Sequence, residues 1–323
     1  MAVTEKEVLM KADHIKVYFK GKNKKDPSVK AVDDVSFSVM KGETFGVVGE
    51  SGCGKSTLGR TLIRLLDPTE GHIYLEDQDI AGMKGKELKS MRRKAQIIFQ
   101  DPSACLNPRR TVKQILLEPF EIHQMMGKMD VEARIMELLN LVGLDAYHLS
   151  RYPHELSGGQ KQRIGIARAL ALEPEIIICD EAVSALDVSV QAQVLNLLQE
   201  LQKKLGLTYF FISHNLNVVY QVSDRVGVMY LGKMVEIAGC DQLYEKRYHP
   251  YTEALLSAIP QVGQDGQTER IRLEGEVPSP SAPPSGCRFH TRCPKATPRC
   301  GQEQPELKEV EPGHFVACHL YQA

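Results

Sequence analysis

Hydrophobic and polar residues follow different patterns in different parts of this chain. Near the N-terminus, Val35, Phe37 and Val39 alternate with serines, which is the period-two pattern of a half-buried strand. We therefore expect antiparallel sheet within the first forty residues. Further on, short apolar runs that predict strands occupy residues 44–48, 72–75, 97–99, 176–179 and 208–213.

Apolar residues at helical spacing separate these runs. They predict helices over residues 57–66, 112–126 and 130–142, with no convincing strand between the last two. Residues from about 101 to 157 are therefore predicted to be a helical insertion. A further helix ends at Gly206 and carries these apolar residues on one face: Val194, Leu197, Leu198, Leu201 and Leu205. The fold class predicted is α/β, with an N-terminal antiparallel β subdomain and a helical insertion.

Composition and charge argue against nucleic-acid-binding, membrane-spanning and secreted proteins. The 323 residues suit one large domain with an appendage, or two domains, and 25% charged with 42% hydrophobic residues is ordinary globular composition. A formal net charge of −1 gives no positive field for nucleic acid, so no nucleic-acid partner is expected. No apolar run approaches the roughly 18 to 20 residues that span a bilayer, and the first thirteen residues are too charged for a signal peptide. We expect a soluble, cytoplasmic protein whose membrane role, if any, comes through a partner.

Residues 49–57 carry the clearest chemical signal. They are GESGCGKST, which fits the phosphate-binding loop of nucleotide triphosphatases, and they lie between a strand-like run and a helical segment as that motif requires. The glycines allow tight turns that aim backbone N–H groups at phosphate oxygens, and the helix N-terminus adds partial positive charge. Lys55 is predicted to reach the β- and γ-phosphates, and Ser56 to bind Mg²⁺. We therefore expect a P-loop NTPase core that binds a nucleotide triphosphate.

Polar residues also follow three other apolar strands: Gln100, the pair Asp180-Glu181, and His214. Each alone has an ordinary explanation, since such residues are common where a strand meets solvent or within a core. In a mostly parallel sheet, however, ligands bind at the carboxyl ends of strands. We therefore expect Asp180 to bind Mg²⁺ and Gln100 to bind Mg²⁺ or the lytic water. Glu181 is expected to act as base for that water, and His214 to contact the γ-phosphate, so that Gln100, Glu181 and His214 are the predicted catalytic residues.

Residues 156–160, LSGGQ, precede a long helical segment. Ser157 is well placed as its N-cap, and the two glycines leave backbone N–H groups open toward an anion. As a bare helix cap this sequence would be unremarkable. Between a phosphate loop and an Asp-Glu strand it predicts a second phosphate site.

With this motif, residues from about 8 to 259 resemble the ATP-binding cassette (ABC) family. The resemblance implies two cassettes facing head to tail, in which Ser157 and Gly159 of one touch the γ-phosphate held by Lys55 of the other. It also implies an interface loop at 184–187, a switch role for His214, and adenine stacking by Tyr18. The predicted nucleotide-binding residues are Tyr18, Gly49, Ser51, Gly52, Cys53, Gly54, Lys55, Ser56, Thr57, Ser157, Gly158, Gly159, Gln160 and Asp187.

A narrower resemblance rests on QDPSACLNPR at residues 100–109, on YHPY at 248–251 followed by TEALLSAIP, and on C-terminal cysteines. Together these look like the ATPase subunits of bacterial dipeptide and oligopeptide importers, a group that includes nickel importers. That family usually has Tyr-Gly-Ser after the Asp-Pro, where this chain has Ser-Ala-Cys. The resemblance implies a second cassette, identical or paralogous, two transmembrane permease subunits, an extracytoplasmic binding protein, and a place on the cytoplasmic face of the membrane.

Four of the eight cysteines follow residue 286. Cys287, Cys293, Cys300 and Cys318 have the spacing C-x₅-C-x₆-C-x₁₇-C, which lacks the tight pairs usual for structural zinc. Wider loops suit a [4Fe–4S] cluster, and similar tails in the importer family have been associated with one. We therefore divide the chain into a nucleotide-binding domain at 1–260 and a linker with a small Cys-rich C-terminal domain at 261–323. Zinc and unmetallated thiols stay open as alternatives.

Two rival functions come from other classes. A soluble cassette ATPase of DNA repair or translation would normally show a long coiled coil, two cassettes in one chain or a basic face, and none is evident. A redox sensor would make the cysteine tail dominant, with a metal cluster that regulates or replaces transport. The complete ATPase motifs argue against replacement, and a redox-sensing tail on a transporter ATPase stays open as an alternative. Nickel is the alternative cargo to peptides.

Overall fold

The computed structural model describes residues 7–21, 27–258 and 271–322. The chain divides into two compact units, one made of Met1–Ala81 with Ile212–Ala323 and the other of Gly82–Phe211. The predicted domain boundary at residue 260 lies outside the described residues.

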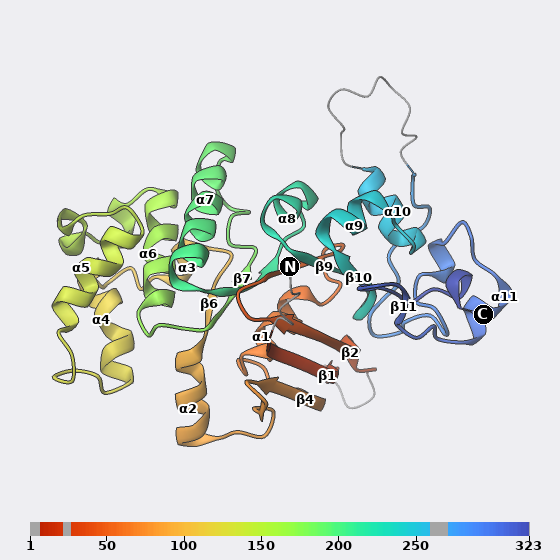
Figure 1. The fold of residues 1–323 in the computed structure, drawn as a ribbon, viewed down its shortest axis with the longest axis horizontal. Helices are drawn as coiled ribbons and strands as arrows, with labels where there is room; N and C mark the ends of the chain where they lie inside the picture. The colour runs from red at the N-terminus through yellow and green to blue at the C-terminus, as the bar shows by residue number, and fades with distance from the viewer. Residues whose placement is uncertain (1–6, 22–26, 259–270, 323) are drawn as a thin grey trace, which may run out of the picture. The chain divides into compact units, whose positions relative to one another are not determined.

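An antiparallel sheet opens the first unit, with strand order β2-β1-β4-β5 (Figure 1). Its strands are β1 (Val8–Phe19), β2 (Val29–Met40), β4 (Glu70–Leu75) and β5 (Gln78–Asp79). The predicted alternation is confirmed, because Val35, Phe37 and Val39 are buried while the serines between them are half-buried. Alternate burial along a strand indicates that one face of the antiparallel sheet packs on a core and the other faces outward.

A second sheet of the first unit carries the strand that leads into the phosphate loop. In spatial order its strands are β11 (Lys308–Glu311), β12 (His314–Val316), β10 (Lys233–Gly239), β9 (Arg225–Tyr230) and β3 (Thr44–Val48). Among these strands only β3 and β9 pair in parallel. Strand β12 belongs to the Cys-rich C-terminal segment predicted at 261–323, called the cysteine tail below, and it pairs with β10. The helices of this unit are α1 (Lys55–Leu62), α8 (Leu216–Val222), α9 (Cys240–Glu245), α10 (Pro250–Ser257) and α11 (Pro298–Gln302), with 3₁₀ turns at His290–Arg292 and His319–Tyr321.

The second unit joins strands to helices. Strand β7 (Ile176–Asp180) lies between β6 (Ala95–Ile98), to which it is parallel, and β8 (Thr208–Ile212). Its helices are α2 (Gly85–Lys94), α3 (Pro102–Cys105), α4 (Val112–Ile122), α5 (Val131–Leu141), α6 (Gly158–Leu170) and α7 (Val188–Leu205), with 3₁₀ turns at Ala146–Ser150 and Pro153–Glu155. The predicted run of helices between β6 and β7 is confirmed (Figure 1).

Some element boundaries differ from the expected ones. Helix α1 begins two residues early, directly after the left-handed Gly54, and ends at Leu62, because Arg64 also has a left-handed backbone, with φ of 54°. Helix α4 stops at Ile122 rather than 126, shortly before left-handed Gln124. Leu205 was expected on the buried face of α7, but it is 41% exposed at the last residue of that helix.

Strands β9 to β12 were not predicted, although the apolar run Val226–Tyr230 was visible in the sequence. Leu231 and Gly232 join β9 to β10 with φ values of 44° and 81°. Two consecutive left-handed residues form the type I′ turn that matches the twist of a hairpin. Such turns usually contain Asn-Gly or Asp-Gly, and because this one contains Leu-Gly, the sequence did not indicate a hairpin.

A buried carboxylate fastens the tail to this hairpin. Glu236 of β10 is fully buried, accepts hydrogen bonds from the backbone N–H groups of Tyr248 (2.8 Å) and His249 (3.0 Å), and lies 2.7 Å from Nε2 of His314. His314 is the first residue of β12 and is also fully buried. The tail strand is therefore held by a polar network that has no access to water.

Replacing Glu236 by alanine should lower the free energy of unfolding by about 3 kcal/mol, because it leaves buried partners unpaired. Denaturant unfolding measures the loss, and hydrogen exchange should rise at residues 308–316. Glu306→Ala, which removes an exposed ion pair with Lys308, is the control and should change stability by less than about 0.5 kcal/mol. Equal stability of the two variants would contradict this role of Glu236.

Candidate functional site

The phosphate loop follows β3 and leads directly into α1. Gly49 and Gly54 have φ values of 154° and 106°, and a Cβ on either would meet a backbone oxygen, that of Met229 at 2.1 Å or Ala31 at 2.0 Å. These two positions therefore exclude any side chain. Gly52 has a φ of 78°, and a Cβ there would meet nothing within 4 Å, so space remains on its open side.

Lys55 closes the loop on itself. Its Nζ donates to the carbonyl oxygens of Gly49 (2.8 Å) and Glu50 (3.0 Å), and the side chain is only 5% exposed. Because the buried ammonium of Lys55 binds these two backbone carbonyls, the loop curves around that ammonium. Exposed Ser51 and Gly52 lie at the outer side of the same curve. The loop thus fits a phosphate group, which would find this charge and the start of α1 together.

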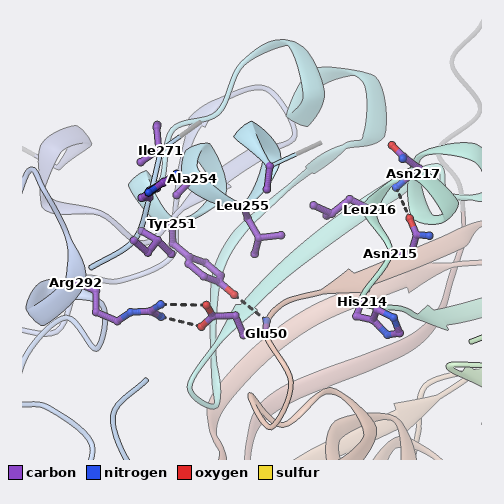
Figure 2. Close-up of a pocket in the computed structure, with 13 residues that line it drawn as sticks. Glu50, His214, Asn215, Leu216, Asn217, Tyr251, Ala254, Leu255, Ile271 and Arg292 are labelled. Carbon is purple, nitrogen blue, oxygen red and sulfur yellow. Dashed lines mark hydrogen bonds and ion pairs between the residues drawn. The ribbon is translucent and has the colours of Figure 1, made fainter. Parts of the chain in front are cut away.

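Residues from distant parts of the first unit also hold the phosphate loop. The backbone N–H of Glu50 donates to the hydroxyl of Tyr251 (2.9 Å), and its carboxylate receives two hydrogen bonds from Arg292, at 2.8 and 3.2 Å (Figure 2). The N–H of Gly232 donates to the carbonyl of Cys53 (2.9 Å). The loop is therefore fixed from the β9–β10 turn, from α10 and from the cysteine tail.

His214 lies near the phosphate loop. The N–H of its neighbour Ser213 donates to the carbonyl of Val47 in β3 (3.3 Å), and His214 and Glu50 both line a cavity of about 840 Å³ (Figure 2). Among the described residues that line this cavity, Lys55 does not appear. The cavity therefore flanks the phosphate loop and does not enclose it.

Tyr18 is half-buried at the end of β1, and its hydroxyl donates to the carboxylate of Asp33. Burial, and then this hydrogen bond, raise the pKa of Tyr18 well above its ordinary value. The other oxygen of Asp33 accepts from Arg288 of the tail. The ammonium of Lys30 lies 5.7 Å from the centre of the Tyr18 ring. Tyr18 is thus oriented by charged neighbours.

Within the second unit, two of the predicted catalytic residues meet. Parallel pairing places the ends of β6 and β7 side by side, and Nε2 of Gln100 donates to a carboxylate oxygen of Glu181 at 2.9 Å. Glu181 has a left-handed backbone with φ of 50°, which is uncommon outside glycine and is concentrated at functional positions. Asp180, the last residue of β7, is only 2% exposed.

The LSGGQ segment forms the N-terminus of α6. Ser157 and Gln160 make a capping box, in which the N–H of Gln160 donates to Oγ of Ser157 (3.3 Å) and the N–H of Ser157 donates to Oε1 of Gln160 (2.9 Å). Ser157 and Gly158 are exposed. A Cβ on Gly159 would lie 2.7 Å from the side chain of Val190 in α7, so this glycine is required by packing.

The loop before α7 is also exposed. Asp187 is the N-cap residue of α7 and is exposed, and the next residue, Val188, is 83% exposed.

The four tail cysteines influence one another electrostatically. Burial, together with weaker effects of negative charge on Cys300, Cys318 and Cys293, raises the pKa of Cys287 to about 11. Burial likewise raises the pKa values of Cys293 and Cys318. Nevertheless, no group of three or more His, Cys, Asp or Glu side chains in the described part of the chain is arranged to hold a metal ion. In this geometry the thiols fit neither a preformed iron–sulfur site nor a preformed zinc site.

Several residues of the site were not predicted from the sequence. Arg288 and Arg292 lie between Cys287 and Cys293. They were not predicted to be part of the site, because only the cysteines in this segment indicated a metal site. Glu50 occupies a variable position of the phosphate-loop motif, and Tyr251 was noted only as part of a resemblance. Their contacts join positions up to 255 residues apart, so no local pattern marks them.

Two family models and several known proteins match this chain. A family model described as "ABC transporter" matches residues 32–184, and one described as "Oligopeptide/dipeptide transporter, C-terminal region" matches residues 235–300. The chain is 56% identical to an oligopeptide transport ATP-binding protein, AppF, of Bacillus subtilis, over 99% of this chain and all of that protein. It is 54% identical to a probable peptide ABC transporter ATP-binding protein of Sinorhizobium fredii, over 91% and 83% of the two chains.

Solved structures give the same assignment. A dimeric post-hydrolysis state of the ATP-binding cassette MJ0796, bound to ADP and phosphate, matches with a TM-score of 0.64 and 29% identity, over 72% of this chain and 98% of that one. CbiO1 of Clostridium perfringens, part of an ABC transporter complex, matches with a TM-score of 0.64 and 25% identity, over 75% and 92% of the chains. No helix in the described ranges is long and apolar enough to cross a membrane. The chain belongs to the ABC transporter ATPase family, within the group that has an oligopeptide/dipeptide transporter C-terminal region.

Proposed function

We propose that this ABC-type ATPase powers the import of dipeptides or oligopeptides through separate membrane-spanning subunits, from the cytoplasmic face of the membrane. The observation that carries the proposal is 56% identity across 99% of the chain with an oligopeptide transport ATP-binding protein. The match of residues 235–300 to the oligopeptide/dipeptide C-terminal region supports the same cargo class.

We assign the chemistry to ATP with Mg²⁺. Lys55 and the loop N–H groups bind phosphate oxygens, while Ser56, Gln100 and Asp180 are the ligands proposed for Mg²⁺. Glu181 accepts the proton of the attacking water, and Gln100, which already donates to Glu181, holds that carboxylate in place. His214 contacts the γ-phosphate, and Tyr18 stacks on adenine.

The active form proposed is a pair of cassettes, of which the second is identical or paralogous. Exposed Ser157 and Gly158, with Gly159, Gln160 and Asp187, face the nucleotide of the partner. Two permease subunits and an extracytoplasmic binding protein complete the importer. Dimer closure on ATP, hydrolysis and reopening drive its cycle.

Motion in this cycle reaches the permeases through the segment after Gln100. Arg168 of α6 donates to the carbonyl of Cys105 (2.7 Å), and Lys161 of α6 donates to Oγ of Ser103 (3.2 Å). The LSGGQ helix and the loop after Gln100 are therefore tied together within the second unit. A displacement of α6 against a partner's nucleotide would move this loop with it.

The test is to purify the tagged chain from its own membranes and identify its companions, then measure uptake in cells that lack it. Two membrane-spanning proteins should copurify, and uptake of labelled peptides should fall while nickel uptake is retained. Copurifying ribosomal or DNA-repair proteins would support the soluble rival, and loss of nickel uptake alone would overturn the peptide cargo.

For the cysteine tail we propose a structural [4Fe–4S] cluster, supported by the wide sequence spacing of Cys287, Cys293, Cys300 and Cys318. Since the thiols must lose protons and move closer to bind metal, the tail has to rearrange on binding. Protein purified without oxygen should absorb broadly near ~400 nm and carry about four irons per chain. Replacing any of the four by serine should remove the colour, whereas Cys240→Ser, outside the tail, should keep it. Colourless protein, with one bound zinc or no metal, would refute the cluster.

A further inference from the structure

A seven-residue segment of the tail, Cys287–Cys293, contacts two parts of the nucleotide site. Between its cysteines it carries Arg288, Phe289 and Arg292. Phe289 is 1% exposed and packs its ring against Tyr230 and Tyr251, with centroids 5.2 and 5.4 Å apart. Such aromatic contacts, well removed from water, hold the segment in a defined position.

Arg288 anchors the segment at its first end. Its guanidinium donates to the carbonyl of Leu231 in the hairpin turn and to the carboxylate of Asp33, and the residue is 5% exposed. Asp33 in turn accepts from the hydroxyl of Tyr18. Because Arg288 is fixed at two acceptors, one in the β9–β10 turn and one in β2, the residues after it are placed with little freedom.

Arg292 reaches the phosphate loop from this anchored segment. It makes a two-pronged ion pair with Glu50, and its side chain is 7% exposed while that of Glu50 is 31% exposed. The geometry is the fork arrangement that makes arginine–carboxylate pairs strong and directional. Glu50 is the second residue of the loop that receives the triphosphate, and its carbonyl also accepts from Lys55.

We infer that Arg292 is a positioning residue for nucleotide binding, which acts by neutralising Glu50 at the mouth of the phosphate loop. The carboxylate of Glu50 and the triphosphate are both negative, so without Arg292 the loop would present a repulsive charge to its ligand. In the partly buried site this repulsion is screened less than it would be in water. The inference rests on the phosphate loop as the nucleotide site and adds that the cysteine tail controls the charge of that loop.

The test compares two substitutions that break the same ion pair. Arg292→Gln leaves Glu50 charged, and the dissociation constant of the full chain for MgATP, measured by calorimetric titration, should rise about tenfold. Glu50→Gln removes the repulsive charge and leaves Arg292 positive, so the constant should not rise above the wild-type value. The double variant should bind nearly as well as Glu50→Gln alone, and the effect of Arg292→Gln should shrink as salt is raised.

The outcomes separate this inference from a merely structural role. If Arg292 only anchored the tail, Glu50→Gln would weaken MgATP binding as much as Arg292→Gln, and the double variant would recover nothing. Either result would overturn the inference. Arg292→Lys, which keeps the charge, should retain most of the affinity and guards against misfolding of the glutamine variant. Arg299→Gln, which removes an exposed ion pair with Glu303 on the same tail, is the matched control and should change nothing.

The same titrations distinguish the inference from the phosphate-loop assignment itself. Lys55→Ala should abolish measurable MgATP binding if the loop is the nucleotide site. If Lys55→Ala loses MgATP binding but Arg292→Gln binds MgATP with wild-type affinity, only the role of Arg292 is refuted. If both variants bind MgATP as the wild type does, the assignment of the phosphate loop as the nucleotide site is refuted as well.

Discussion

Replacing Glu181 by glutamine should slow ATP hydrolysis at least ~100-fold while leaving ATP binding close to wild type. Glutamine keeps the shape of the side chain and can still make a hydrogen bond with Gln100, whose Nε2 lies 2.9 Å from the Glu181 carboxylate. What is lost is the negative charge that accepts a proton from the attacking water. The left-handed backbone at Glu181 is already present in the wild-type chain, so the substitution adds no new strain.

Steady-state phosphate release measures the rate, and size-exclusion chromatography with ATP should show a trapped dimer. Glu200→Gln, at an exposed position of α7, is the control and should hydrolyse ATP normally. Near-normal turnover of Glu181→Gln would remove Glu181 from the role of base.

Replacing Ser157 by arginine should abolish hydrolysis and leave binding of ATP to the single chain intact. Ser157 is exposed at the start of α6, and a long cation there would fill the space proposed for the partner's γ-phosphate. The loss of the capping box costs the helix about 1 kcal/mol, which is too little to unfold the unit.

Mixing supplies the decisive measurement. Ser157→Arg protein mixed with Lys55→Ala protein should form dimers with at most one working site, since each chain then lacks a different half. Ser150→Arg, exposed seven residues upstream, should hydrolyse ATP at the wild-type rate. Equal loss of ATP affinity in the isolated Ser157→Arg chain would show that Ser157 serves the phosphate loop of its own chain.

Local chemistry made much of the site predictable. The phosphate loop needs a strand, glycines and a lysine in one stretch, and residues 44–57 contain all three signals in order. The Ser157 cap and the placement of Gln100 and Glu181 after parallel strands also follow from neighbouring residues. The roles assigned to these residues stay predictions.

Long-range pairing explains what sequence reasoning missed. Arg292 and Glu50 are 242 positions apart, and an arginine between two cysteines gives no sign of its partner. Glu236 interrupts an apolar strand and would be assigned to a solvent face, yet it is buried by His314, 78 positions away. The described residues of the cysteine tail group with the first unit, and a small domain of their own stays a prediction.

The position of the tail strands has a consequence for solubility. Strand β11 is the outer strand of its sheet on that side, and it is short and charged, with the sequence KEVE. Short, charged outer strands discourage other chains from adding to a sheet. Without the tail, β10 would become the outer strand, seven residues long, with buried Met234, Val235 and Ile237 along it. The tail therefore also protects this chain from pairing edge to edge with copies of itself.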